Sequence, residues 1–330
     1  MKRRHRNILQ AIIGALTGFF FLYLTLRNKS LELIFESISE AKWGYVILTG
    51  ILLFVTFVLR ALRWRILIQN LGYTPKRRTV LQAVIMGYFV NSFTPKLGEI
   101  VRCATLQKST GVPLIRSFGS VISERIYDLL VLGLGLVAIF ILEFDRLINL
   151  FERFLTNHSS SSANIFEENL LVFIISSLVI IGLVYYIISK GFHIKLKNIL
   201  KEMYEAIKQT LYLKKYREFL TLTLLIWLSL IAMNYVCLQA LPDTSQNGWY
   251  FATIVLFVGG IGWALPTPGG IGTTHYFIYQ LFFIFNLDPD AGISYGVLSN
   301  GLTFIFTLGI GAVVGLFLLF RQKKTGKGNR

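Results

Sequence analysis

The sequence has little cysteine, little histidine and few acidic residues. Only two cysteines and four histidines occur among 330 residues, and 17 Asp and Glu stand against 33 Lys and Arg. Cys103 and Cys237 fall in opposite halves of the chain and near opposite faces of the topology expected below, which argues against a disulfide. The scattered histidines likewise give no pattern of metal ligands. We therefore expect neither a metal nor a cofactor.

Charged residues of either sign are also scarce, because they make up 15% of the chain while hydrophobic residues make up 54%. The apolar residues occur in long blocks and the mean hydropathy is +0.60, which predicts an all-α polytopic membrane protein. The net charge of +16 comes from short basic runs between these blocks. Such runs set topology and contact anionic headgroups, so the charge does not indicate a nucleic acid partner.

Six apolar segments are long enough to cross a bilayer completely. They are residues 8–26, 43–59, 117–142, 170–189, 219–241 and 291–320. The first follows a basic stretch, as a signal sequence would, but Leu24–Arg27 offers no small-residue cleavage site, and we expect a retained span.

The distribution of Lys and Arg between the loops predicts the orientation. The basic loops are 2–6, 60–78, 190–218 and 321–330, whereas 27–42, 143–169 and 242–248 hold few basic residues. By the positive-inside rule both termini lie in the cytoplasm and the chain is a multi-pass protein of the cytoplasmic membrane. We expect one integral membrane domain, 1–330, in which 191–218 forms a basic amphipathic helix on the cytoplasmic leaflet.

Two further apolar segments, 79–116 and 249–287, are interrupted by proline and glycine at Pro95 and Pro268. The basic loops all fall on the cytoplasmic side only if the first segment enters from the cytoplasm and returns to it, and the second enters from the outside and returns there. This predicts two re-entrant helical hairpins that enter the bilayer from opposite faces. The alternative is two kinked pairs of ordinary spans joined by tight turns.

The two halves of the chain, 43–142 and 219–320, repeat the order of full span, broken hairpin and long span. Opposed hairpins in a repeated order are typical of an inverted repeat. Transporters with this symmetry bind substrate near the midplane, where broken helices meet.

Charged residues inside apolar segments are candidates for function. Glu124 and Asp128 share one face of the segment 117–142, and Arg125 can reach Asp128 three residues along. A structural ion pair explains this group equally well, although its surplus negative charge requires a further cation such as Arg102 or Arg60.

Glu99 and Arg102 follow the Pro95 turn and fall in the first turn of a helix expected to start near Gly98. A helix start attracts anions, and the guanidinium fork of Arg102, with Lys96 beside it, suits a lipid phosphate. Alternatively, Glu99 caps the helix and Arg102 extends to the inner headgroups.

In the second interrupted segment, Gly269, Gly270 and Gly272 leave backbone amides free to face a ligand. His275 could bind substrate or relay a proton, or it could serve a structural role. Asn91 is a polar group in an apolar segment that either holds helices together or binds ligand.

Four motifs together resemble the lysylphosphatidylglycerol synthase transmembrane-region family, also called flippase-like membrane proteins. The motifs are Arg60-x-x-Arg63-Trp64, Asn91-x-x-x-Pro95-x-x-Gly98-Glu99-x-x-Arg102, Glu124-Arg125-x-x-Asp128 and Pro266-x-Pro268-Gly269-Gly270-x-Gly272. The resemblance covers nearly the whole chain. It implies movement of aminoacylated or other phospholipids across the bilayer, and related members are linked to lipid-carried sugars in cell-envelope biosynthesis.

Two features depart from the family pattern. Synthase members carry a C-terminal soluble aminoacyltransferase domain, whereas this sequence ends ten residues after Phe320, so we do not expect lysine transfer from tRNA. Family members often place a glutamate shortly after the last glycine, where this sequence has Thr274-His275-Tyr276.

The sequence thus favours a flippase-like protein that translocates a phospholipid or a lipid-linked headgroup and is a transporter rather than an enzyme. The alternative is a membrane transferase or synthase that acts on a lipid-linked sugar or headgroup with Glu124 or Asp128 as base. Membrane phospholipids with anionic headgroups are the expected partners. Copies of the same chain and other envelope-biosynthesis proteins are further candidates.

Overall fold

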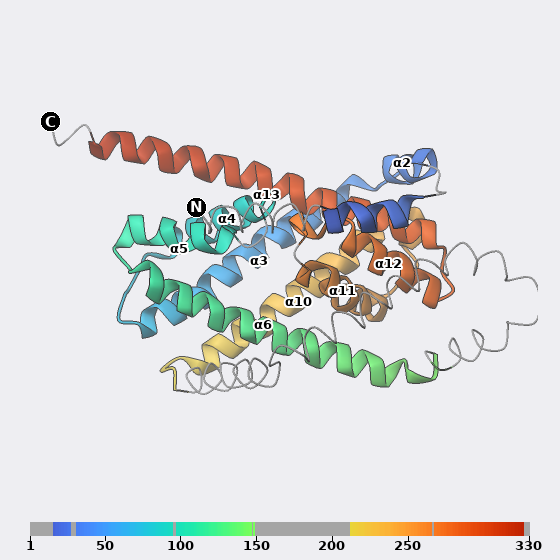
Figure 1. Ribbon diagram of the computed structural model, residues 1–330, viewed down its shortest axis with the longest axis horizontal. Helices are drawn as coiled ribbons and strands as arrows, with labels where there is room; N and C mark the ends of the chain where they lie inside the picture. The colour runs from blue at the N-terminus through green and yellow to red at the C-terminus, as the bar shows by residue number, and fades with distance from the viewer. Residues whose placement is uncertain are drawn as a thin grey trace, which may run out of the picture. The chain divides into compact units, whose positions relative to one another are not determined.

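The computed structural model describes residues 16–27, 31–94, 97–146, 148, 212–265 and 267–326, and this part of the chain is helical and has no strand (Figure 1). The chain divides into two compact units, Met1–Leu136 with Leu213–Arg330, and Val137–Tyr212. All contacts discussed below lie within the first unit. The helices are α2 (Leu31–Ser39), α3 (Trp43–Asn70), α4 (Arg77–Asn91), α5 (Leu97–Thr110), α6 (Leu114–Leu142), α10 (Tyr216–Ala240), α11 (Trp249–Ala264), α12 (Thr273–Ile284) and α13 (Pro289–Gly326), with short 3-10 turns η2 (Pro242–Thr244) and η3 (Pro268–Gly270).

Four of these helices are long and apolar enough to cross a membrane: α3, α6, α10 and α13 through Phe320. They contain most of the predicted spans 43–59, 117–142, 219–241 and 291–320. The predicted span 8–26 is described only as the shorter apolar helix Leu16–Leu26. The predicted span 170–189 and most of the predicted amphipathic helix 191–218 lie outside the described residues.

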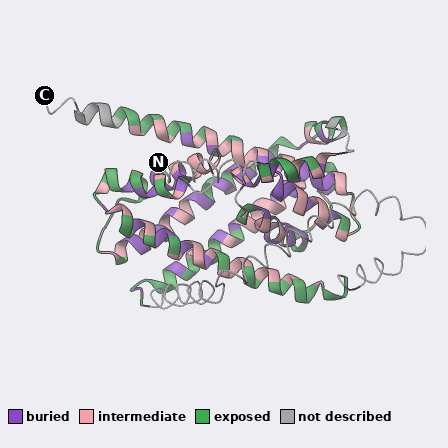
Figure 2. Ribbon diagram, viewed as in Figure 1, coloured by how far each residue is buried: buried purple, intermediate pink, exposed green. Residues whose placement is uncertain are grey.

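Burial differs sharply between the spanning helices. In the most apolar stretch of each helix, 39% of the residues are buried in α3 and 33% in α10. The corresponding shares are 0% in α6 and 11% in α13 (Figure 2). Leu134 on α6 and Val313 on α13 are among many large apolar side chains that are exposed. Exposed apolar faces of this length are expected of helices that face lipid, and of the four long helices α3 and α10 contribute the larger buried share.

Helices α3 and α10 pack side by side and run antiparallel. The N–H of Lys42, before α3, donates to the carbonyl of Ala240, at the end of α10, over 2.8 Å. In the middle of the pair, the hydroxyl oxygens of Thr56 and Ser229 are 3.0 Å apart. The two helices occupy the same place in the two halves of the chain, and an inverted repeat requires this antiparallel arrangement.

The first interrupted segment is a pair of antiparallel helices, α4 and α5. The N–H of Gly98, at the start of α5, donates to Oδ1 of Asn91, at the end of α4, over 2.8 Å. Further from the turn, a Cβ added to Gly87 would lie 3.0 Å from Cβ of Arg102. The backbones therefore approach closely at glycine. Pro95 and Lys96, in the turn itself, lie outside the described residues.

The second interrupted segment is also a pair of antiparallel helices, α11 and α12, joined through η3. A Cβ added to Gly262 would lie 2.6 Å from Cα of Thr274, next to the turn. At the open end of the pair, the rings of Phe251 and Phe282 meet edge to face with centroids 5.2 Å apart. Glycine contacts thus hold the two helices of each pair close together, and both segments are helical hairpins.

The two hairpins lie along α13 in opposite directions. In the first, Arg78 near the open end stacks on Phe317, 4.6 Å from the ring centroid, and Phe93 at the turn meets Phe304 with centroids 6.0 Å apart. Figure 1 accordingly shows α4 and α5 toward the C-terminal end of α13 and α12 toward its N-terminal end.

In the second hairpin, a Cβ added to Gly292 would meet the ring of Phe282 near the open end. At the turn, a Cβ on Gly296 would lie 3.3 Å from the His275 ring. The two turns therefore reach α13 between Gly296 and Phe304, about 12 Å of helix. Re-entry of the two hairpins into a membrane stays a prediction.

We expect Gly98→Ala to disrupt the first hairpin. Its Cβ would overlap the carbonyl oxygen of Gly87 and crowd the side chain of Asn91, and backbone atoms cannot move aside cheaply. The melting temperature in detergent should fall by about 5 °C or more.

The matched control is Gly119→Ala on α6, where nothing lies within 4 Å of the added Cβ. It should leave the melting temperature unchanged or raise it slightly, because alanine favours helix. Equal effects of the two substitutions would contradict the close packing of α4 against α5.

Candidate functional site

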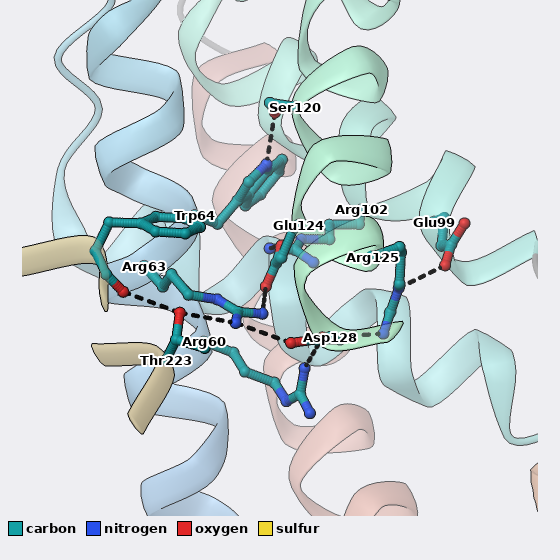
Figure 3. A network of polar contacts seen from close by, with 11 residues as sticks. Arg60, Arg63, Trp64, Glu99, Arg102, Ser120, Glu124, Arg125, Asp128 and Thr223 are labelled. Carbon is teal, nitrogen blue, oxygen red and sulfur yellow. Dashed lines mark hydrogen bonds and ion pairs between the residues drawn. The ribbon is translucent and has the colours of Figure 1, made fainter. Parts of the chain in front are cut away.

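Seven charged side chains from three helices form one ionic network in the first unit (Figure 3). They are Arg60 and Arg63 of α3, Glu99 and Arg102 of α5, and Glu124, Arg125 and Asp128 of α6. Their spacing explains why they meet. Residues three or four apart share a helix face, so Arg60 with Arg63 and Glu124 with Asp128 present paired charges to the same space.

Glu124 lies at the centre of the network and is almost completely buried. Its Oε1 accepts a hydrogen bond from Nη2 of Arg63 at 3.0 Å, and its Oε2 lies 2.8 Å from Nη2 of Arg102. One carboxylate thus joins α3, α5 and α6. A buried carboxylate is tolerated because both of its oxygens face guanidinium groups.

Asp128 forms the second junction of the network. Its Oδ1 lies 2.8 Å from Nη1 of Arg63, and its Oδ2 accepts a hydrogen bond from Nη1 of Arg60 at 2.9 Å. The predicted pairing with Arg125 is weaker, since the two groups are 3.9 Å apart. Arg125 instead donates from Nε to Oε1 of Glu99 at 2.8 Å. That contact fastens α5 to α6 a second time.

Three polar or aromatic residues complete the surroundings: Trp64, which belongs to the first of the four motifs, and Ser120 and Thr223, which were not among the candidate residues. The guanidinium of Arg102 stacks 3.9 Å from the ring centroid of Trp64, and Trp64 Nε1 donates to Ser120 Oγ at 2.9 Å. Arg63 also donates to Oγ1 of Thr223, on α10, over 3.3 Å. Ser120 and Thr223 could have been found only as small polar residues within apolar helices, which is a weak signal.

The network holds one positive charge in excess, because four guanidinium groups face three carboxylates. The sequence analysis expected a third group, Arg102 or Arg60, to balance Glu124 and Asp128. The structure brings in both, and Arg63 as well. The network therefore has a net charge that favours an anion rather than a cation.

Arg102 is buried between Trp64 and Glu124. It is 3% exposed, its guanidinium stacks on Trp64 and its Nη2 lies 2.8 Å from Glu124, and its contact with a lipid phosphate stays a prediction. The accessible pair is Arg125 with Glu99, whose side chains are 35% and 24% exposed. Any ligand reaching the network from outside would meet Arg125 first.

The predicted site residues of the hairpin turns are not part of this network. Asn91 Oδ1 accepts the N–H of Gly98 and so caps the start of α5. His275 Nδ1 accepts the N–H of Gly272, at 3.3 Å, at the start of α12. Both contacts favour the structural alternatives. Gly269, Gly270 and Gly272 have φ of 58°, 71° and 83°, which residues with a Cβ rarely adopt.

Neither cysteine is paired: Cys103 and Cys237 are free and buried. Within the described residues no group of three His, Cys, Asp or Glu side chains could hold a metal ion.

Comparison with known proteins places the chain among membrane proteins. Residues 8–311 match the family model described as lysylphosphatidylglycerol synthase TM region. The chain belongs to this family. A curated relative, a UPF0104 membrane protein of Methanocaldococcus jannaschii, is 24% identical over 97% of this chain and 99% of its own length. No solved structure matches the chain.

Membership of the lysylphosphatidylglycerol synthase TM region family confirms the resemblance seen in the four motifs. Together with four helices of spanning length, it makes the chain a membrane-embedded protein of several helices. The residues of the ionic network come from three of the four motifs and lie within the matched range. The motif residues therefore meet in space although they are distant in sequence.

We expect Glu124→Gln to destabilise the fold strongly. The substitution keeps the size of the side chain but leaves Arg63 and Arg102 buried without their shared carboxylate, which costs about 3–5 kcal/mol in comparable buried pairs. The melting temperature should fall by about 10 °C.

Glu218→Gln is the matched control, because Glu218 forms an exposed pair with Lys215 at 3.3 Å. Exposed pairs contribute about 0–1 kcal/mol, so its melting temperature should stay near that of the wild type. A small effect at both positions would contradict the central role of Glu124.

Proposed function

We propose that the protein translocates a phospholipid or a lipid-linked headgroup across the cytoplasmic membrane. The observation that supports this proposal most strongly is the pair of opposed helical hairpins whose turns both reach α13 between Gly296 and Phe304. In membrane transporters, interrupted helices of this kind are tolerated at depth only where protein or a wet cavity receives their free backbone groups. Membership of a lipid-related membrane family supports the same reading.

The ionic network is the proposed contact for the headgroup. Its excess positive charge suits the single negative charge of a phosphodiester, and Arg125 is the guanidinium with the largest exposed fraction, 35%. The ion pair of Arg125 with Glu99 is part-buried, and it is easier to separate than the fully buried pairs of Glu124. A phosphate can therefore replace Glu99 on Arg125 more readily than it could replace Glu124.

The buried members of the network would then act as a fixed support. Arg63, Glu124 and Arg102 hold α3, α5 and α6 together. Because α5 is one arm of the first hairpin, releasing Glu99 from Arg125 would free that hairpin from α6 at one of two contacts. In this scheme headgroup binding loosens the hairpin while the acyl chains stay in the bilayer.

We expect Arg125→Gln to slow translocation. Proteoliposomes containing a fluorescent phospholipid would be treated with an impermeant quencher, and the rate at which inner-leaflet lipid becomes quenched would be measured. Loss of a charge-assisted contact of about 1.5–3 kcal/mol should slow the rate about tenfold or more. Arg116→Gln is the control, because Arg116 lies on the same helix, is exposed and is outside the network.

Equal rates for Arg125→Gln and Arg116→Gln would contradict the role of Arg125. Equal rates for wild-type and protein-free liposomes would contradict translocation itself. Mass spectrometry of the lipids in the same liposomes distinguishes translocation from the transferase alternative, because a transferase would produce a chemically new lipid.

The membrane arrangement is tested by cysteine labelling. The native cysteines are buried, so single substitutions report on their own positions. An impermeant maleimide should label Lys215→Cys only from the cytoplasmic side and Gln246→Cys only from the outside. Labelling of Phe93→Cys and Ile271→Cys, at the two hairpin turns, should be far slower from either side. Rapid labelling of both turns from one compartment would contradict opposed re-entrant hairpins.

A further inference from the structure

The turn of the second hairpin contains a compact group of buried oxygen atoms. Oγ1 of Thr273 lies 2.9 Å from the carbonyl oxygen of Gly262, 3.1 Å from that of Gly270 and 3.0 Å from Oγ1 of Thr267. These four residues come from the end of α11, from η3 and its flank, and from the first position of α12. All four are buried.

Both carbonyl oxygens of this group depend on the same hydroxyl, that of Thr273. The hydroxyl of Thr273 carries one hydrogen and can satisfy only one of the two carbonyl oxygens. In a continuing helix, the carbonyl of Gly262 would accept the N–H of residue 266, but Pro266 has no N–H. Leaving a buried carbonyl unsatisfied costs about 1–3 kcal/mol. The group therefore favours a ligand that binds oxygen.

A fifth oxygen lies next to the group. Oγ1 of Thr274 is buried, in a residue that is 3% exposed, and finds no hydrogen-bond partner among the described residues. It lies over Gly270, because a Cβ added to that glycine would be 2.7 Å from it.

The local helix ends also favour positive charge at this position. The carbonyl of Gly262 belongs to the last turn of α11, where the helix dipole is negative. The opposing amide at the start of α12, the N–H of Gly272, is already taken by Nδ1 of His275. In membrane transporters, unwound carbonyls and helix C-terminal ends are the groups that coordinate Na⁺.

From these observations we infer that the turn between α11 and α12 binds a small monovalent cation, Na⁺ or Li⁺, through Gly262, Thr267, Gly270 and Thr273. All four oxygen ligands are neutral, whereas Ca²⁺ sites in proteins are normally built with carboxylates. The three contacts of Thr273 Oγ1, at 2.9–3.1 Å, gather four oxygen atoms close enough to contact one small cation.

Cation binding would join the end of α11 to the start of α12 at the point where the second hairpin meets α13. The role of the ion as a driving force for lipid movement rests on the proposed function. The binding itself does not, because it depends only on the oxygen atoms of one hairpin.

The test is thermal unfolding of the purified full chain in detergent, in NaCl, LiCl, KCl or choline chloride at equal ionic strength. A Na⁺ concentration tenfold above the dissociation constant should raise the melting temperature by about 2–4 °C relative to choline, with saturation. Thr273→Val should abolish this shift. Thr253→Val should retain it, because Thr253 is exposed on α11 and donates only along its own helix to Trp249.

Equal melting temperatures of the wild type in all four salts would overturn the inference, and so would a full Na⁺ shift in Thr273→Val. If Thr273→Val does not fold, Thr267→Val should lose the shift and Thr273→Ser, which keeps the hydroxyl, should retain it. Lipid translocation without a Na⁺ shift would refute only the cation site. A Na⁺ shift without translocation would refute only the proposed function.

Discussion

The arrangement of the first hairpin depends on the ion pairs of the Glu124 carboxylate with Arg63 and Arg102. A buried charge is tolerated only with close partners of opposite sign, and Glu124 finds Arg63 at 3.0 Å and Arg102 at 2.8 Å. Because these partners belong to different helices, the charge requirement fixes α3, α5 and α6 to one another. The stacking of Arg102 on Trp64 and the bond from Arg63 to Thr223 extend the same constraint to the α3–α10 interior.

The second constraint is the cost of irregular backbone among apolar helices. The structure meets it differently in the two hairpins. The start of α5 is capped by Asn91, whereas the turn before α12 combines left-handed glycines with threonine hydroxyls and a histidine cap. In the second turn two carbonyl oxygens share the hydroxyl of Thr273. The two turns therefore satisfy their backbone groups by different means, although both reach the same stretch of α13.

Much of the fold could be predicted from the sequence because hydropathy and helix breakers are local. The blocks around 43–59, 117–142, 219–241 and 291–320 fall on α3, α6, α10 and α13, and the interruptions near Asn91 and Pro268 separate paired helices. The sequence pointed to the charged residues of the ionic network but could not tell how deep each one lies. Arg102 lies behind Trp64, and Arg125 is the more exposed guanidinium.

The sequence by itself determined that the chain is an apolar helical membrane protein and which residues interrupt or charge its helices, since these properties depend on neighbouring residues. Only the tertiary structure decided which charges pair. The choice among Arg60, Arg63, Arg102 and Arg125 depends on how helices distant in sequence pack. The oxygen group around Thr273 likewise exists only because α12 folds back onto the end of α11, which brings Gly262 within 2.9 Å of that hydroxyl.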